Sequence, residues 1–172
     1  MLKRLTALLI VFTITSYSFA AGINSLFGTF DRVIDGDTLV FKTASAKTLR
    51  IRLADIDTPE LDQPWGEEAK VALSGWVQGE RGRIDIVDTD RYGRPVATVW
   101  IDDENINRRL VKDGHAWVYR KYLRDRTLLS LETNARAKKL GLWLSNNVVT
   151  PEAWRGDSRR RTAVQLILSV SD

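Results

Sequence analysis

Two short acidic segments carry the residues most able to do chemistry. The first is Asp35-Gly36-Asp37-Thr38, which taken alone is typical of a turn, because Asp and Gly are favoured there on backbone grounds. The second, Asp55-Ile56-Asp57-Thr58-Pro59-Glu60, puts three carboxylates into six residues. Carboxylates this close disfavour one another's ionisation unless a cation lies among them, and a hard divalent cation with oxygen ligands meets that need. If the two segments converge, Asp37 and Asp57 form a candidate metal site.

Two arginines accompany these carboxylates. Arg52 lies five residues before Asp57, and Arg94 follows the turn signal Asp90-Arg91-Tyr92-Gly93. A lone arginine on a strand most often lies on a solvated face, but guanidinium groups near an acidic cluster can bind phosphate oxygens bidentately. A cation and arginines would neutralise the charge that develops on phosphorus while a carboxylate activates water. The combination therefore predicts a phosphodiester-cleaving site.

The elements that must position these residues follow from the hydrophobic pattern. β-type runs cover residues 28–34, 38–42, 47–54, 83–88 and 96–101, and in 47–54 apolar residues alternate with Arg50 and Arg52. A helix is expected around residues 69–76, a second after a cap at Asn105, and a third over 128–140. Five short strands with a helix between the third and fourth predict an α+β fold, a five-stranded OB-fold β-barrel with three helices.

Length and composition limit the possibilities further. The 172 residues fit one domain, and 44% hydrophobic with 28% charged residues excludes a wholly disordered chain. The chain has no cysteine, so it has neither a disulfide nor a lipid anchor on Cys.

The first twenty residues read as a secretory signal peptide. Lys3 and Arg4 precede an apolar run over 5–14, and Ser18-Phe19-Ala20 forms a cleavage site with small residues. An uncleaved membrane anchor is the rival interpretation, but the run is short against the about 20 residues that a bilayer span needs. Removing residues 1–20 lowers the formal net charge from +4 to +2, so overall charge is weak support for a nucleic-acid partner.

Three sequence blocks resemble a known family. Residues 33–38, residues 52–60 and Asp90-Arg91-Tyr92-Gly93-Arg94 are similar, in this order, to the signature blocks of staphylococcal-type thermonucleases. The resemblance covers roughly residues 30–143, and it implies the same OB-type barrel with three helices.

The resemblance also implies roles for individual residues. Asp37 and Asp57 match calcium ligands through their carboxylates, and Thr58 through its main-chain carbonyl. Glu60 matches the general base, and Arg52 and Arg94 match the arginines that hold the scissile phosphate. Tyr92 and Tyr119 are candidates for contact with the nucleotide, with Tyr122 an alternative to Tyr119.

Some segments depart from the family pattern. Residues 61–66 lack the lysine-rich loop of the staphylococcal enzyme. His115, the only histidine, has no motif that places it near the carboxylates, so we expect a surface or packing residue. The basic stretch Arg155 to Arg161 is expected to be solvated.

We therefore expect a signal peptide over 1–20, a linker over 21–27, a thermonuclease-like OB-fold nuclease domain over 28–145 and a basic C-terminal tail over 146–172. The expected function is that of a secreted or periplasmic, monomeric, calcium-dependent (Ca2+) nuclease. It would hydrolyse phosphodiester bonds in DNA and RNA, leave 3′-phosphate ends, and have no stable membrane insertion after cleavage of the signal.

Two alternatives remain. One is a non-catalytic OB-fold module that binds nucleic acid, and the other is a structural domain stabilised by calcium. The first predicts loss of carboxylates or arginines, which this chain retains, and the second leaves Arg52 and Arg94 without a role.

Overall fold

The structure, a computed structural model, describes residues 24–157. The expected signal peptide and residues 158–172 of the expected tail lie outside this range. Between residues 24 and 157, the helices are all too short or too polar to cross a bilayer.

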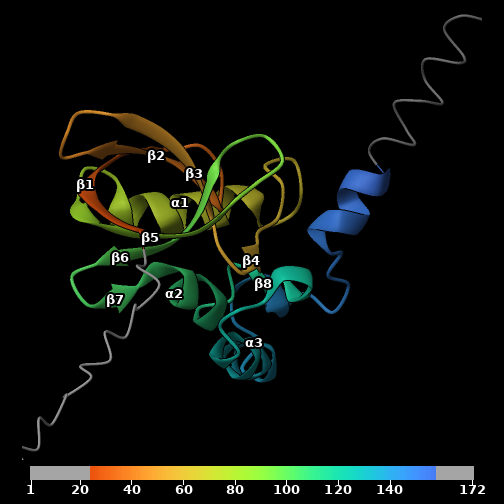
Figure 1. Cartoon of the computed structure of the whole chain (residues 1–172). Coiled ribbons are helices and arrows are strands. Elements are labelled where there is room, and N and C mark those ends of the chain that lie inside the picture. Colours follow the sequence, from red (N-terminus) through yellow and green to blue (C-terminus); the bar gives the residue numbers. More distant parts are fainter. Residues whose placement is uncertain (1–23, 158–172) are drawn as a thin grey trace, which may run out of the picture.

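Five strands form a closed barrel (Figure 1). They are β1 (Asn24–Val33), β2 (Thr38–Thr43), β3 (Thr48–Leu53), β5 (Arg81–Thr89) and β6 (Pro95–Ile101). Neighbours pair antiparallel in the order β3-β2-β1-β5-β6, and a parallel pairing of β3 with β6 closes the ring. The short β7 (Glu104–Asn105) pairs antiparallel with the end of β6. The prediction of a five-stranded, OB-type α+β barrel is confirmed.

β1 is longer than expected. It begins at Asn24, inside the segment expected to be a linker, because residues 24–29 pair with residues 81–86 of β5. Residues 28–33 of the same strand pair with β2, and a register shift between Phe30 and Arg32 marks a bulge in this pairing.

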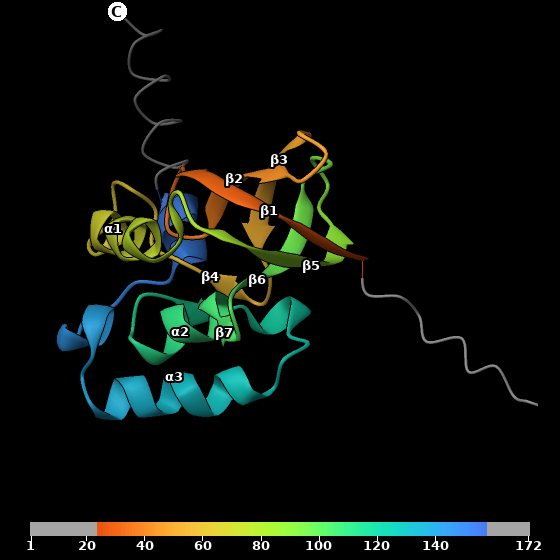
Figure 2. The same ribbon diagram turned by 90° about the vertical axis from the view of Figure 1, so that its left-hand side faces the viewer.

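The three expected helices are α1 (Gly66–Val77), α2 (Ile106–Lys112) and α3 (Thr127–Ala137). The Asn105 side chain accepts from the N–H of Arg108 and caps α2 as expected. α3 ends earlier than expected, before Lys139, which has a left-handed φ of 52°. Short 3-10 helices lie on either side of α3, at η1 (Arg120–Tyr122) and η2 (Gly141–Leu144), and residues 151–157 are also helical. α2 lies between the barrel and α3 (Figure 2).

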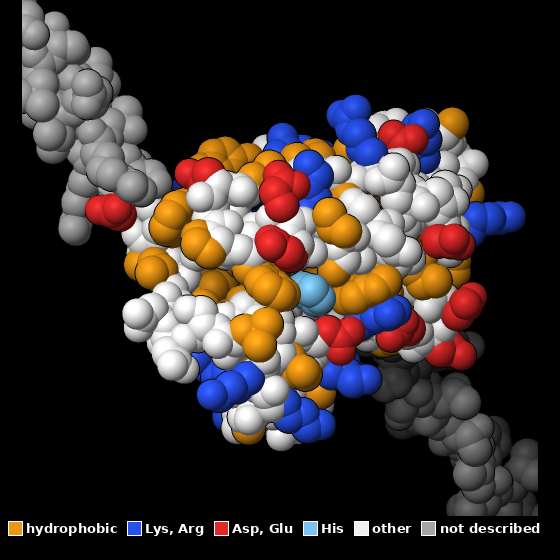
Figure 3. Space-filling view, turned by 180° about the vertical axis from the view of Figure 1, so that it is seen from behind, with side chains coloured by type: hydrophobic (Ala, Val, Ile, Leu, Met, Phe, Trp, Pro, Cys, Tyr) orange, Lys and Arg blue, Asp and Glu red, His pale blue; other side chains and the backbone are white. Residues whose placement is uncertain are grey.

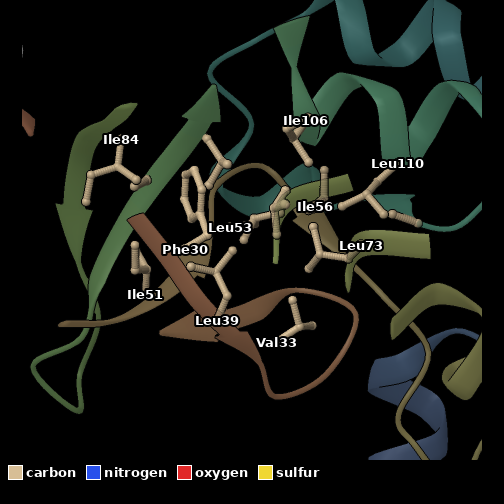
Figure 4. Close-up of a cluster of buried hydrophobic side chains, with 14 of the residues drawn as sticks. Phe30, Val33, Leu39, Ile51, Leu53, Ile56, Leu73, Ile84, Ile106 and Leu110 are labelled. Carbon is tan, nitrogen blue, oxygen red and sulfur yellow. The ribbon is translucent and has the colours of Figure 1, made fainter. Parts of the chain in front are cut away.

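The core fills the barrel and extends to the helices (Figure 4). Phe30 contacts Phe41 with ring centroids 5.0 Å apart. Each fully buried large side chain of this kind stabilises the fold by roughly 1.5–3 kcal/mol. The other members come from strands and helices alike: Leu39, Ile51, Leu53, Ile56, Leu73, Ile84, Ile106 and Leu110. A smaller cluster packs Trp117 and Trp143 edge to face beneath α3.

A two-stranded sheet joins the helical layer to the second acidic segment. β4 (Ile56–Asp57) pairs antiparallel with β8 (Trp117–Val118). Glu132 of α3, only 2% exposed, accepts from the N–H of Val118 and from two arginine side chains. The position of Asp57 therefore depends on α3 as well as on the barrel.

His115 is a packing residue, as expected. Its ring stacks on Trp65 and meets Trp76 of α1 edge to face, and Trp65 Nε1–H donates to His115 Nδ1 at 3.1 Å. Figure 3 shows the histidine surrounded mainly by hydrophobic side chains. Burial lowers the pKa of His115 below 6.5, although Asp113 and Glu68 oppose the shift.

This packing predicts a pH dependence of stability. Because the pKa of His115 is lower in the folded than in the unfolded chain, the unfolded chain binds the proton first as the pH falls. The packing of the neutral His115 ring therefore contributes fully to the unfolding free energy above pH 6.5, and this contribution is lost as the pH falls below that value. Denaturant unfolding at pH 7.5 and pH 5 should show a larger loss of unfolding free energy in the wild type than in His115→Gln. Equal losses in the two proteins would contradict the packing account.

Candidate active site

The turn between β1 and β2 presents Asp37 to the end of β3. The Asp35 carboxylate accepts from the N–H of Asp37 at 3.1 Å, which closes the turn. The carbonyl of Asp37 accepts from the N–H of Leu53 at 2.8 Å. The register pairs Thr38 with Arg52, so the sheet itself brings Asp37 beside Arg52.

Gly36 lets this turn pack against the second acidic segment. A Cβ at Gly36 would lie 2.6 Å from Thr58 Oγ1, 2.8 Å from Thr58 Cβ and 3.0 Å from Ala69 Cβ. A larger residue would therefore push the turn away from Thr58 and from α1. The glycine is required by close approach, not by backbone conformation.

Arg52 joins the two acidic segments. Its Nη1 donates to Asp37 Oδ1 at 3.0 Å and its Nη2 donates to Asp57 Oδ1 at 2.7 Å. The N–H of Thr58 points to Asp37 Oδ2 at 3.4 Å, and the Thr38 hydroxyl donates to Asp37 Oδ1. Asp37 and Asp57 are each only 4% exposed. Because one guanidinium group bonds to both carboxylates, its width sets the distance between them.

Burial dominates the electrostatics of Asp37. It raises the pKa of this carboxyl to about 7, with Arg52 opposing the shift and the negative charges of Asp35 and Asp57 adding to it. Desolvation by burial would lower the pKa of Arg52, but the carboxylates of Asp37 and Asp57 raise it by more, so its guanidinium stays charged. A further cation beside Asp37 would favour its ionised form and oppose the effect of burial.

The donor set fits a hard cation held by few protein ligands. Asp37 and Asp57 supply two adjacent carboxylates, and carboxylates and carbonyls are the ligands that calcium takes. The third carboxylate, Asp55, faces elsewhere and accepts from the N–H groups of Arg124 and Asp125. Over residues 24–157, no three Asp, Glu, His or Cys side chains gather as a metal cluster. The set therefore needs the carbonyl of Thr58 and water to be complete.

Arg94 approaches from the hairpin between β5 and β6. Asp90 holds it, because the Arg94 Nε–H donates to Asp90 Oδ2 at 2.7 Å and the backbone N–H donates to Oδ1 at 2.9 Å. The N–H of Tyr92 donates to the same Oδ1, and Gly93 has a φ of 79° that closes the turn. The expected hairpin connection is confirmed.

A cleft of about 560 Å³ collects these residues. All the candidate site residues line it except Asp57, which lies behind Arg52 and is bonded to it. Tyr119 and Tyr122 lie in its wall with ring centroids 5.5 Å apart. Tyr92 is 69% exposed at its rim, below the guanidinium groups of Arg91 and Arg94. The cleft thus combines acidic, basic and aromatic surfaces.

Sequence reasoning missed two residues. Asn107 is 3% exposed, accepts from the N–H of Val99 and donates to the carbonyls of Ala54 and Ala97, which fixes the end of β3. A polar residue next to the apolar Ile106 at the start of α2 was its only signal. Arg155, expected to be solvated, instead donates to Asp57 and Glu60, so that expectation is wrong.

Comparisons with known proteins agree on one family. Residues 50–145 match the family model described as staphylococcal nuclease homologue. An "Uncharacterized endonuclease" of Haemophilus influenzae is 39% identical over 151 residues, 88% of this chain and 83% of the relative. "Protein ParB" of Escherichia coli is 40% identical over 92% of this chain and 93% of its own length. A "Probable staphylococcal-like nuclease CAN1" of Oryza sativa is 40% identical over 69% of this chain and 36% of the relative.

The close approach at Gly36 makes a testable prediction. Gly36→Ala should lower the unfolding free energy by about 1–3 kcal/mol, because the added methyl group overpacks the contact with Thr58. Gly75→Ala in α1 is the matched control, since no atom lies within 4 Å of the position of its Cβ. The control should gain about 0.5–1 kcal/mol from helix propensity. Denaturant unfolding measures both, and equal effects of the two substitutions would contradict the packing at Gly36.

Proposed function

The chain belongs to the staphylococcal nuclease family and is a nuclease, and we propose that it hydrolyses phosphodiester bonds in DNA and RNA with calcium, outside the cytoplasm. The observation that carries this proposal is the pairing of Asp37 and Asp57 by Arg52, which lines one cleft together with Glu60 and Arg94.

The acidic pair is proposed to hold calcium through the carboxylates of Asp37 and Asp57 and the carbonyl of Thr58. When bound there, calcium would neutralise charge on the scissile phosphate and polarise it. The electrostatics of Asp37 support this assignment, because burial raises the pKa of its carboxyl to about 7 in spite of Arg52, and a bound cation would favour the ionised form.

Glu60 is the proposed general base. Its side chain is 38% exposed, so water can reach it, whereas Asp37 and Asp57 are almost fully buried. It would take the proton from the attacking water as the water oxygen bonds to phosphorus. Cleavage of the bond from phosphorus to the 5′ oxygen then leaves a 3′-phosphate on one product, and the departing 5′ oxygen takes up a proton from solvent to become a hydroxyl.

Arg52 and Arg94 are proposed to bind the scissile phosphate. They come from β3 and from the residue before β6, and these strands pair in parallel next to the cleft. Their anchoring carboxylates fix both guanidinium groups before substrate arrives, so little order is lost when the charge on phosphorus increases. Tyr92 and Tyr119 are proposed to stack on the flanking bases, a contact that every base can make.

The location of the activity rests on the sequence. The basic start, the apolar run and Ser18-Phe19-Ala20 support export by a signal peptide, so the enzyme is proposed to act in the periplasm or outside the cell. It is proposed to act as a monomer.

The metal and the base predict a clear assay result. Mature protein should digest single-stranded DNA with calcium and lose this activity in EDTA. Glu60→Gln should slow cleavage by about 10²–10⁴-fold, because proton transfer from water is lost, and should leave substrate binding intact. Glu80→Gln, an exposed carboxylate outside the cleft, is the control and should cleave at the wild-type rate. Full activity in EDTA would refute the metal assignment.

The geometry of the guanidinium predicts the effect of a conservative change. Arg52→Lys keeps the charge but cannot reach Asp37 and Asp57 together and still bind phosphate bidentately, so kcat/KM should fall by about 10²–10³-fold. Arg50→Lys, on the same strand but exposed and outside the cleft, should change little. A wild-type rate for Arg52→Lys would remove the bidentate argument.

A further inference from the structure

The chain after η2 returns to the cleft and docks on the loop that leads into α1. The Gln63 side-chain N–H donates to the carbonyl of Val149 at 2.6 Å, and Gln63 is only 5% exposed. Trp154 Nε1–H donates to Asp62 Oδ1 at 3.1 Å. Val148 packs against the Trp117 cluster, and Pro151 is buried. Figure 1 shows this helical end of the described chain, in blue, beside the loop between β4 and α1.

The docked segment places Arg155 on the acidic residues of the site. Its Nη1 donates to Glu60 Oε1 at 2.5 Å and its Nη2 to Asp57 Oδ2 at 3.0 Å. Arg52 already occupies Asp57 Oδ1, so both oxygens of Asp57 are bound to arginine. One guanidinium therefore covers a proposed metal ligand and the proposed general base at the same time.

We propose that residues 148–157 form a latch that closes the active site, with the Arg155 guanidinium in competition with calcium for Asp57 and with water for Glu60. This inference rests on the proposed function of the same site. Calcium binding then requires Arg155 to leave, so the latch sets the calcium concentration at which the nuclease becomes active.

The contacts of Arg155 allow calcium to displace its guanidinium. The side chains of Arg155 and Glu60 are each 38% exposed, and an ion pair this accessible to water is weak and exchanges easily. The side chain of Asp57 is only 6% exposed, so calcium must replace the positive charge of Arg155 there as the guanidinium leaves. The contacts of Gln63 and Val148 lie further from the cleft and can hold the segment nearby while Arg155 is displaced. Tethering keeps the effective concentration of the guanidinium high, so the latch closes again when calcium is lost.

The latch also gives a role to the loop that departs from the family pattern. Residues 61–66 lack the lysines of the staphylococcal enzyme, and here Asp62 and Gln63 supply the contacts for the returning chain. The Asp62 carboxylate accepts from the Trp154 indole, which a lysine ammonium could not do because it has no acceptor.

Calcium affinity tests the latch without any assay of activity. Isothermal titration of the mature full chain should show a dissociation constant about tenfold lower for Arg155→Gln than for the wild type, as expected if the open form is populated at roughly 10%. Lys112→Gln, an exposed residue of α2 outside the cleft, removes the same charge and should bind calcium like the wild type. Equal affinities for Arg155→Gln and the wild type would overturn the latch.

Trypsin tests the same movement in the wild type, where no substitution can disturb folding. Calcium should speed cleavage of the Arg155–Gly156 bond relative to cleavage after the exposed Lys138, with the products identified by mass. Slower or unchanged relative cleavage with calcium would contradict displacement of Arg155.

Different results would refute the proposed function and the latch. If wild-type activity survives EDTA, the proposed function fails. If activity needs calcium but Arg155→Gln binds calcium like the wild type and turns over more slowly at saturating calcium, only the latch fails, and Arg155 belongs with the arginines that bind substrate.

Discussion

The two hydrogen bonds from Arg52 to Asp37 and Asp57 are the interaction on which the site depends. They link the turn after β1 to β4, and they hold two buried carboxylates close enough for one guanidinium group to bond to both. Removing one partner of such a buried group leaves an uncompensated charge, which is strongly destabilising. Burial also disfavours the ionised form of Asp37, so a further cation beside it is stabilising.

The fold is arranged so that this interaction can form. The β2–β3 register sets Asp37 beside Arg52, and the parallel pairing of β3 with β6 brings the Arg94 hairpin to the same end of the barrel. Asn107 fixes the end of β3, and Glu132 holds β8, whose partner β4 carries Asp57. Barrel and helical layer thus meet at the acidic pair, and burial of polar groups at that junction is matched by hydrogen bonds.

Much of this arrangement follows from sequence. Alternation in residues 47–54 predicted β3 with Arg52 on its polar face, and turn chemistry predicted the hairpin that carries Arg94. The residue types alone could not show that Asp55 and Asp57 have different roles. Asp55 has a left-handed φ of 65°, and its carboxylate accepts from the N–H groups of residues 124 and 125 rather than facing the acidic pair. Arg155 could not be placed either, since its partners Asp57 and Glu60 lie about a hundred residues away and local pattern carries no such information.

The central claim is that the acidic pair joined by Arg52 is a calcium site. Calorimetric titration of calcium into wild-type protein and Asp37→Asn tests it most directly, because the substitution removes one charge and keeps the shape of the side chain. The account predicts one calcium per wild-type chain and an affinity for Asp37→Asn that is lower by orders of magnitude. Binding of calcium to Asp37→Asn with wild-type affinity would contradict it.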